Sequence, residues 1–369
     1  MAEMRDHSAF VIARVQARRS STLIQLAALA GVAACVAGAA MLQGPINRQR
    51  RDLQLVLQSN IYAELPPKYA WISAAGGTFR GLAADYLWVR ADRLKEEGKY
   101  YESHQLAKWI CTLQPRFAAV WSFQSWNMAY NISVATHTGQ ERWQWVYNGI
   151  RLLRDEGIPN NEKVVSLYHQ LAWTWFHKVG DMMDDFHMYY KRTWASTMET
   201  LLGPPPAGVP DAEAADFLRP VAEAPATLEE LLAVRPGVGP LVEELAGLGV
   251  DVRAGTTPQR VLHPLELSFF RPYAKYLQER EMAAFTAAAP GGGERPGLAG
   301  FFDRAAPEDF QPLLAWLRAK VLREQYKMDP AFMHQLPRRL GTEWPVPIDW
   351  RTPWSQAVSY THLTLPTIY

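Results

Sequence analysis

The chain has 369 residues, 48% of them hydrophobic, and a formal net charge of +1 at pH 7. A chain this close to neutral lacks the positive charge that drives nucleic-acid binding, so we expect no nucleic-acid partner. Its two cysteines, Cys35 and Cys111, are too few for a disulfide framework or a cysteine-based zinc site. The length suits about two or three domains.

An apolar segment near the N-terminus predicts a membrane anchor. Residues 22–42 (TLIQLAALAGVAACVAGAAML) carry no charge, and about 20 apolar residues span a bilayer as a helix. Arginines flank both ends of this segment, so the positive-inside rule is nearly balanced. A basic head before a first apolar run, here residues 1–21, is typical of a signal anchor with its N-terminus inside. We therefore expect a single-pass protein of a bacterial inner membrane, with its bulk in the periplasm.

Two alternatives for this segment stay open. Residues 32–35 (VAAC) resemble a lipobox, so a lipid on Cys35 could replace the helix as the anchor. The apolar run continues past Cys35 to Leu42, which favours the transmembrane helix over the lipoprotein. The other alternative is a buried core helix, which the length of the run disfavours.

The last residues do not continue the pattern that precedes them. Residues 358–369 (VSYTHLTLPTIY) resemble a translated sequencing adapter at the end of a contig. We therefore leave them out of the expected fold and do not count His362 as a ligand. The natural chain is expected to continue beyond Ala357.

Between the anchor and residue 203, the sequence predicts a juxtamembrane segment and then helices. Residues 43–73 form the juxtamembrane segment, with a short helix that Pro66 and Pro67 end. From residue 74 onward, apolar residues recur at helical spacing. A first helix is expected to end at Gly98, since glycine is common just past a helix C-terminus.

The next helix, about residues 101–113, carries a pattern of small residues. This pattern resembles a tetratricopeptide repeat, a unit of two helices called A and B. In that family a glycine closes helix A, small residues lie in helix B, and a proline follows helix B. Leu87 and Trp121, 34 residues apart, stand at equivalent starts of successive units, although Ile110 is larger than the family pattern expects. The positions that match are Gly98, Ser103, Ala107 and Pro115.

Two looser helix pairs follow in the same region. Residues 121–133 and 141–156 are expected to form the second pair, and residues 162–178 and 184–202 the third. The resemblance implies an all-α fold, in which residues 74–203 form a tetratricopeptide-like solenoid after the transmembrane helix. Three units are about the minimum that buries a continuous core.

The rest of the chain is expected to be helical without an alignable repeat. Residues 204–226 are rich in proline and alanine and predict a linker. Residues 227–357 form a C-terminal helical region, which contains expected helices at 266–286 and 307–327. Thr227 and Glu230 predict a capping box at the first of its helices.

No residue pattern predicts a metal, cofactor or catalytic site. His169, His177 and His187 are eight and ten residues apart, too far along a helix to share one ion. A Pro-Gly-Val-Gly-Pro turn at 236–240 resembles a DNA-binding helical hairpin, but Glu243 and Glu244 follow where that hairpin needs cations. We read this turn as a connection between two short helices.

The solenoid resemblance implies a binding face on the A helices. Tryptophans are frequent there, and Trp143 and Trp145, two residues apart, must point to different faces. Tryptophan is enriched in binding hot spots as well as in cores. The residues expected to contact a partner are Arg80, Asp85, Arg90, Trp121, Asn127, Tyr130 and Asn131.

The sequence therefore predicts a membrane-anchored helical scaffold that binds protein or peptide partners. Residues 76–134 resemble uncharacterised bacterial membrane-anchored repeat proteins, and that resemblance suggests an accessory of a membrane or export complex. One alternative is an envelope-associated hydrolase with a dispersed site in residues 260–350, built from Arg271 and, at the edge of that region, Asp349, Trp350 and Arg351. A second alternative is a structural spacer.

Overall fold

We analysed a computed structural model of the chain. It describes residues 24–42, 44–46, 48–49, 77–204, 215–257, 260–285, 295–340 and 349–362. The molecule divides into an N-terminal unit, residues 1–63, and a second unit that holds everything described from residue 77 onward. Every element within the described ranges is helical.

The N-terminal unit contains one long apolar helix. Ile24–Ile46 covers 23 residues and is long and apolar enough to cross a membrane, by length and composition. Cys35, the alternative lipidation site, is exposed on this helix. The juxtamembrane segment expected at 43–73 lies almost entirely outside the described residues.

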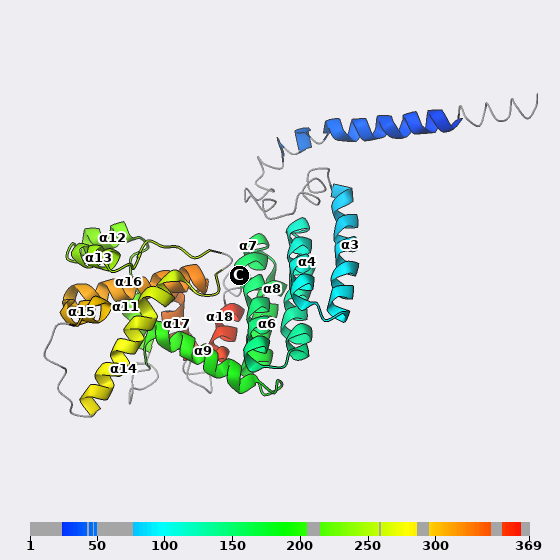
Figure 1. Cartoon of the computed structure of the whole chain (residues 1–369). Coiled ribbons are helices and arrows are strands. Elements are labelled where there is room, and N and C mark those ends of the chain that lie inside the picture. The colour runs from blue at the N-terminus through cyan, green and yellow to red at the C-terminus, as the bar shows by residue number, and fades with distance from the viewer. Residues whose placement is uncertain are drawn as a thin grey trace, which may run out of the picture. The chain divides into compact units, whose positions relative to one another are not determined.

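The second unit begins with helices that lie side by side (Figure 1). Their order along the chain is α3 (Gly77–Glu96), α4 (Tyr100–Leu113), α5 (Ala118–Trp126), the π-helical η2 (Asn127–Ile132), the 3-10 turn η3 (Ser133–Ala135), α6 (Gly139–Arg151), the π-helical η4 (Leu152–Gly157), α7 (Ile158–Asn160), α8 (Val165–Trp173), the π-helical η5 (Thr174–Gly180) and α9 (His187–Leu202).

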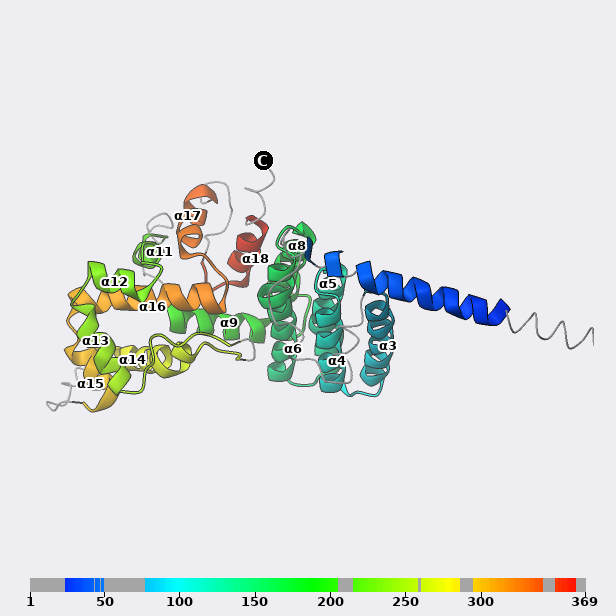
Figure 2. The ribbon, with the colours of Figure 1, turned by 90° about the horizontal axis from the view of Figure 1, so that it is seen from above.

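The later elements are the 3-10 turn η6 (Ala215–Leu218), α11 (Arg219–Ala222), α12 (Leu228–Val234), α13 (Val238–Gly247), the π-helical η7 (Glu266–Phe270), α14 (Arg271–Phe285), α15 (Gly297–Arg304), α16 (Pro307–Gln325), α17 (Pro330–Leu340) and α18 (Pro353–His362). Of these later elements, α11, α12, α13 and α17 pack on the long helix α16, and α18 lies next to α8 (Figure 2).

The helix ends follow the local signals in the sequence. Gly98 has φ +74°, and Lys99 N–H donates to the Leu94 carbonyl at 2.8 Å, which is the bond that closes a Schellman motif. Only glycine adopts this backbone conformation without strain. Thr227 and Glu230 form the expected capping box at the start of α12. These predicted helix ends are confirmed.

Small residues let the first helices approach closely. The Ser103 hydroxyl of α4 donates to the Ala91 carbonyl of α3 at 2.8 Å, and Ala107 is buried beside it. Between α5 and α6, the Ser125 hydroxyl donates to the Gly149 carbonyl at 2.9 Å. A Cβ atom on Gly149 would lie only 2.7 Å from the Ser125 carbonyl oxygen, so this contact requires glycine.

Gly149→Ala should lower the free energy of unfolding by about 1 kcal/mol or more, because overpacking against backbone outweighs the gain in helix propensity. Chemical denaturation of the full chain in detergent, followed by circular dichroism, measures the change. Gly81→Ala is the matched control, since a Cβ there meets nothing within 4 Å. The control should raise stability by about 0.5–1 kcal/mol. Equal effects of the two changes would contradict the close contact.

The C-terminal helix α18 packs against α8 and η5. It runs across the boundary predicted at residue 357, and both Val358 and Tyr360 are buried. The Tyr360 hydroxyl donates to the Tyr326 carbonyl at 3.2 Å. Residues 358–362, which were left out of the expected fold, therefore continue α18, and the side chains of Val358, Ser359 and Tyr360 are buried. The resemblance to an adapter remains a prediction.

The linker predicted at 204–226 is shorter than expected. Residues 205–214 lie outside the described part of the chain. Residues 215–222 form η6 and α11, and α11 packs on α16 and α17 through the buried Val221. The proline-rich composition of this segment predicted a linker, so the short helix α11 was not expected. A helix this short is stabilised by tertiary packing and not by its own sequence. The two regions that the linker was expected to separate form one compact unit.

Candidate functional site

A continuous row of aromatic side chains crosses α3, α5, η2, α8, η5 and α18. Each ring contacts the next, and three of these contacts join helices that are distant in sequence. We call this row the aromatic band, and its members are Trp88, Phe123, Trp126, Tyr130, Trp173, Phe176, His177 and Trp354.

The first half of the aromatic band joins α3 to η2. The ring centroids of Trp88 and Phe123 are 4.9 Å apart. Phe123 lies 6.1 Å from Trp126, which stacks on Tyr130 at 6.1 Å with an interplanar angle of 20°. Tyr130 reaches His177 of η5 at 5.8 Å, and its hydroxyl lies 3.3 Å from His177 Nδ1. These separations are within the range of favourable aromatic contacts.

The second half continues from η5 to the C-terminal helix. His177 stacks on Trp173 at 4.8 Å with an interplanar angle of 13°. Trp173 lies 5.8 Å from Phe176, and Phe176 meets Trp354 edge to face at 4.7 Å. The rings therefore hold one another in place before any partner binds, which lowers the entropic cost of binding.

Large parts of these rings face solvent. Phe123, Trp126, Trp173, Phe176 and Trp354 are each between 37% and 43% exposed. Single exposed apolar residues are ordinary on protein surfaces, but contiguous apolar patches mark interaction sites. Aromatic residues also dominate binding hot spots. The aromatic band is therefore the strongest candidate for an interaction surface in the described part of the molecule.

The sequence builds the centre of the band from two similar pairs. Trp126 and Tyr130 are four residues apart, and so are Trp173 and His177, so each pair lies on one helix face. Each pair spans the start of a π-helical segment, η2 or η5. π-Helical turns inside α-helices are rare and occur frequently at functional sites.

A buried ion pair contacts the aromatic band through Tyr130. Lys178 of η5 is 4% exposed and pairs with Asp184. Its ammonium also lies 5.2 Å from the centre of the Tyr130 ring, a cation–π contact. Burial by itself would raise the pKa of Asp184. Hydrogen bonds from Lys178 and from the Phe186 N–H lower the pKa by a larger amount, so the net shift is downward. Asp184 therefore keeps the charge that holds Lys178 against Tyr130.

The predicted partner residues divide between this surface and the core. Tyr130 is a member of the aromatic band, and Asp85 and Arg90 are exposed on α3, which contributes Trp88. Asn131 is half-buried and donates to the Asn127 side chain at 2.9 Å. The side chain of Arg80 lies outside the described residues.

The structure corrects the prediction for Trp121, which was expected to contact a partner. It is 2% exposed, and its indole N–H donates to the Pro115 carbonyl at 2.9 Å. Trp121 precedes Trp126 by five residues, which places the two side chains about 140° apart around the helix. Only one of them can face solvent, and packing buries Trp121. Asn127 is also buried, at 7% exposure, and its side chain accepts a hydrogen bond from the half-buried Asn131.

Sequence reasoning missed most of the aromatic band. Phe123, Trp126, Trp173 and Phe176 were visible as aromatic residues on expected A helices, and the repeated four-residue spacing was the available signal. Trp354 carried no such signal, because only the docking of α18 on η5 brings it to Phe176. Of the two neighbouring tryptophans on α6, Trp145 is buried and Trp143 is half-buried against Tyr147 and Tyr190.

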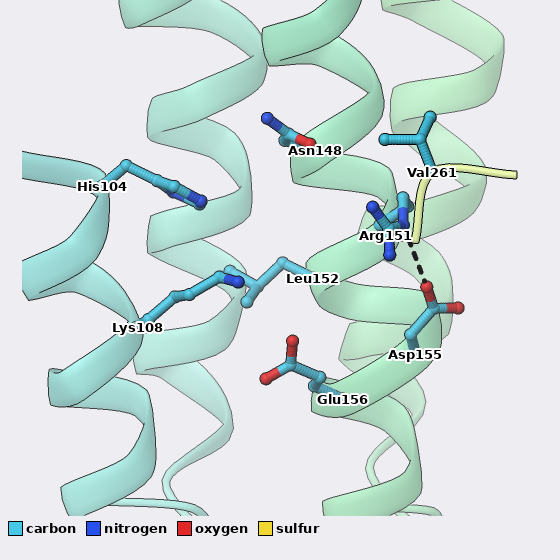
Figure 3. A pocket seen from close by; sticks show the side chains of 8 residues that line it. All are labelled: His104, Lys108, Asn148, Arg151, Leu152, Asp155, Glu156 and Val261. Carbon is cyan, nitrogen blue, oxygen red and sulfur yellow. Dashed lines mark hydrogen bonds and ion pairs between the residues drawn. The ribbon is translucent and has the colours of Figure 1, made fainter. Parts of the chain in front are cut away.

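A polar cavity of about 190 Å³ lies between α4, α6 and η4 (Figure 3). Val261, from the segment before η7, closes one side of it. The other residues that line the cavity are His104, Lys108, Asn148, Arg151, Leu152, Asp155 and Glu156. Burial lowers the pKa of His104 to about 4, and the positive charge of Lys108 adds to this shift. His104 is therefore neutral at pH 7.

The residues of the hydrolase alternative have structural partners. Arg351 donates to the Gly203 carbonyl at 2.6 Å and to Asp349 at 2.9 Å, which ties α18 to the end of α9. Trp350 is 2% exposed. Arg271 is exposed at the start of α14. Within the described ranges, no group of three or more His, Cys, Asp or Glu side chains is arranged to hold a metal ion.

Comparisons with protein-family models, with curated proteins and with solved structures found no significant match to this chain. Its function is therefore inferred from the geometry described above.

Proposed function

We propose that the chain is a membrane-anchored helical scaffold that binds an extended segment of a partner protein along the aromatic band. The single observation that supports this most is the band itself, a contiguous and mutually stacked row of aromatic rings with more than a third of several rings exposed. The apolar N-terminal helix would hold the scaffold in a bacterial inner membrane with its bulk in the periplasm.

We further propose that α3 to α9 form a tetratricopeptide-like solenoid of three helix pairs. Support comes from the side-by-side packing of consecutive helices, the glycine turn at Gly98 and the buried small residues Ser103 and Ala107. In this arrangement α3, α5–η2 and α8–η5 are the A helices. The partner-binding face of such solenoids is the concave one.

The dimensions of the band favour an extended partner. It crosses three neighbouring A helices and α18, and packed helix axes are about 8–10 Å apart, so it covers about 27 Å. An extended chain advances about 3.3 Å per residue, so about eight residues span it. Extended segments, including polyproline II segments, are known to dock on aromatic-lined grooves.

Photo-crosslinking in native membranes tests the proposal. A photoreactive phenylalanine analogue replaces Trp126 or Trp173 in the full chain, and cross-linked adducts are identified by mass spectrometry. The same analogue at Phe285, which is 89% exposed on α14 and outside the band, is the matched control. We expect the same protein adduct from positions 126 and 173 and none from position 285. Equal adducts at all three positions, or none, would contradict a specific binding face and favour a structural spacer.

A further inference from the structure

The polar atoms of the aromatic band are mainly hydrogen-bond donors. An indole nitrogen donates and cannot accept. In the buried Trp121, the indole N–H already donates to the Pro115 carbonyl at 2.9 Å. The tryptophans of the band make no such bond within the described residues, and they are Trp88, Trp126, Trp173 and Trp354. A partner that covers the band therefore has to bring acceptors to these donors.

Tyr130 and His177 add a donor at the centre of the band. The Tyr130 hydroxyl lies 3.3 Å from His177 Nδ1. Burial raises the pKa of the Tyr130 hydroxyl, so it keeps its proton at neutral pH. A phenol is a better donor than an imidazole N–H, so Nδ1 accepts and the Nε2 atom of the neutral ring carries the hydrogen. His177 therefore also presents a donor to a partner.

The backbone under the band cannot pair with a strand. The band lies on α-helical and π-helical segments, whose N–H and C=O groups bond within the helix. A partner in β conformation would bury its own N–H groups against the rings without acceptors, which is unfavourable. A proline residue has a carbonyl acceptor and no N–H. A proline-rich segment therefore supplies acceptors and has few donors to lose.

The spacing of the helices matches the repeat of a polyproline II helix. The segments α5–η2 and α8–η5 pack directly on each other. Packed helix axes are about 8–10 Å apart. A polyproline II helix has about 3 residues per turn and rises about 3.1 Å per residue, so one turn advances about 9.3 Å. Every third residue of such a segment would therefore meet the next helix of the band.

We propose that the partner segment is proline-rich, with a proline at every third position, and that it lies along the aromatic band as a polyproline II helix. This inference rests on the proposed function, because it names the kind of segment that the same surface binds. One proline packs on Trp126 and Tyr130, and the next packs on Trp173 and His177. The segment's carbonyl groups, which have no partners within a polyproline II helix, accept from the indole N–H groups.

Fluorescence anisotropy of labelled synthetic peptides tests the inference on the full chain in detergent. The first peptide, about nine residues of alanine and proline, has a proline at every third position. The second has the same composition with its prolines at uneven intervals. The third has threonine in place of each proline, which favours an extended backbone and restores the N–H groups. We expect the first peptide to bind with a Kd at least about five-fold lower than that of either of the others.

A pair of tryptophan variants tests the donors. Trp173→Phe keeps an aromatic ring and removes the indole N–H, so the Kd of the first peptide should increase about three- to ten-fold, as expected for one lost hydrogen bond. Trp143→Phe is the matched control, since Trp143 is half-buried on α6 and outside the band. The Kd should change by less than about two-fold in this control.

Three results would each overturn the inference: no binding of the first peptide, equal affinities for the three peptides, or an unchanged Kd in Trp173→Phe. The photo-crosslinking experiment separates this failure from a failure of the proposed function. A shared protein adduct at positions 126 and 173, together with any of these three results, would mean that the band binds a segment of another kind. The absence of such an adduct would contradict the binding face itself.

Discussion

Replacing Arg154 with methionine should lower the free energy of unfolding by about 3–5 kcal/mol, the range expected when one member of a buried ion pair is removed. Arg154 is 2% exposed, and it donates to Asp155 at 2.7 Å. Methionine keeps much of the volume of the side chain and removes the charge. The loss of the guanidinium leaves Asp155 without its closest cation and removes the cation–π contacts described next.

Arg154 also links the helix pairs to the C-terminal helices. Its guanidinium lies 5.7 Å from the ring centre of Tyr147 on α6 and 5.6 Å from that of Tyr326 at the end of α16. The Tyr326 hydroxyl in turn donates to the buried Glu266 at 2.6 Å. Burial raises the pKa of Glu266, and the hydrogen bond from Tyr326 only partly offsets this shift. Arg154 therefore lies at the centre of a polar network that joins both regions of the unit.

Chemical denaturation of the full chain in detergent measures this change, with circular dichroism as the probe. Arg271→Met is the control, since Arg271 is exposed on α14 and such surface changes usually stay within about 0.5 kcal/mol. A loss of less than about 1 kcal/mol in Arg154→Met would mean that the two regions do not depend on this network.

Trp194→Ala is the second change with a large expected effect, a loss of about 3–5 kcal/mol in the free energy of unfolding. Trp194 of α9 is 1% exposed. Its ring centroid lies 4.5 Å from that of Trp175 and 5.6 Å from that of Tyr326. Truncation to alanine leaves a large cavity where the third helix pair meets α16, and the surrounding helices cannot collapse to fill it.

Trp173→Ala provides the comparison for this core substitution. Trp173 is two residues before Trp175 but is 43% exposed in the aromatic band. Its removal should cost about 1 kcal/mol or less, because it creates no buried cavity. Thermal unfolding of both variants in the same detergent gives the difference. Similar losses in the two variants would show that the band is part of the core and not a binding surface.

The positions of most helices could be predicted from the sequence because the signals for them are local. Apolar periodicity located the helices between residues 77 and 202, the glycine at 98 marked one helix end, and the capping box at 227 marked a helix start. Helices expected at 266–286 and 307–327 are confirmed as η7–α14 and α16. Such signals act over a few residues and do not require knowledge of neighbouring elements.

The candidate sites were less predictable because periodicity does not fix which face of a helix becomes covered. Trp121 and Trp126 are chemically identical and five residues apart, yet packing against the neighbouring helices buries the first and exposes the second. His104 lies on α4, and the other residues of its cavity, such as Asn148 and Arg151, lie more than forty residues away in the sequence. No spacing rule connects residues at that distance.

The sequence by itself determined an all-helical chain, an apolar segment long enough to span a membrane and the ends of many helices. These features depend on backbone capping, periodicity and length, all of which are local or additive. Only the tertiary structure decided that α18 covers α8 and η5, that Trp354 extends the aromatic band and that residues 77–362 belong to one compact unit. The physical reason is that burial depends on contacts between segments that are distant in sequence. Each helix has several faces that could be buried, and these contacts determine which one is.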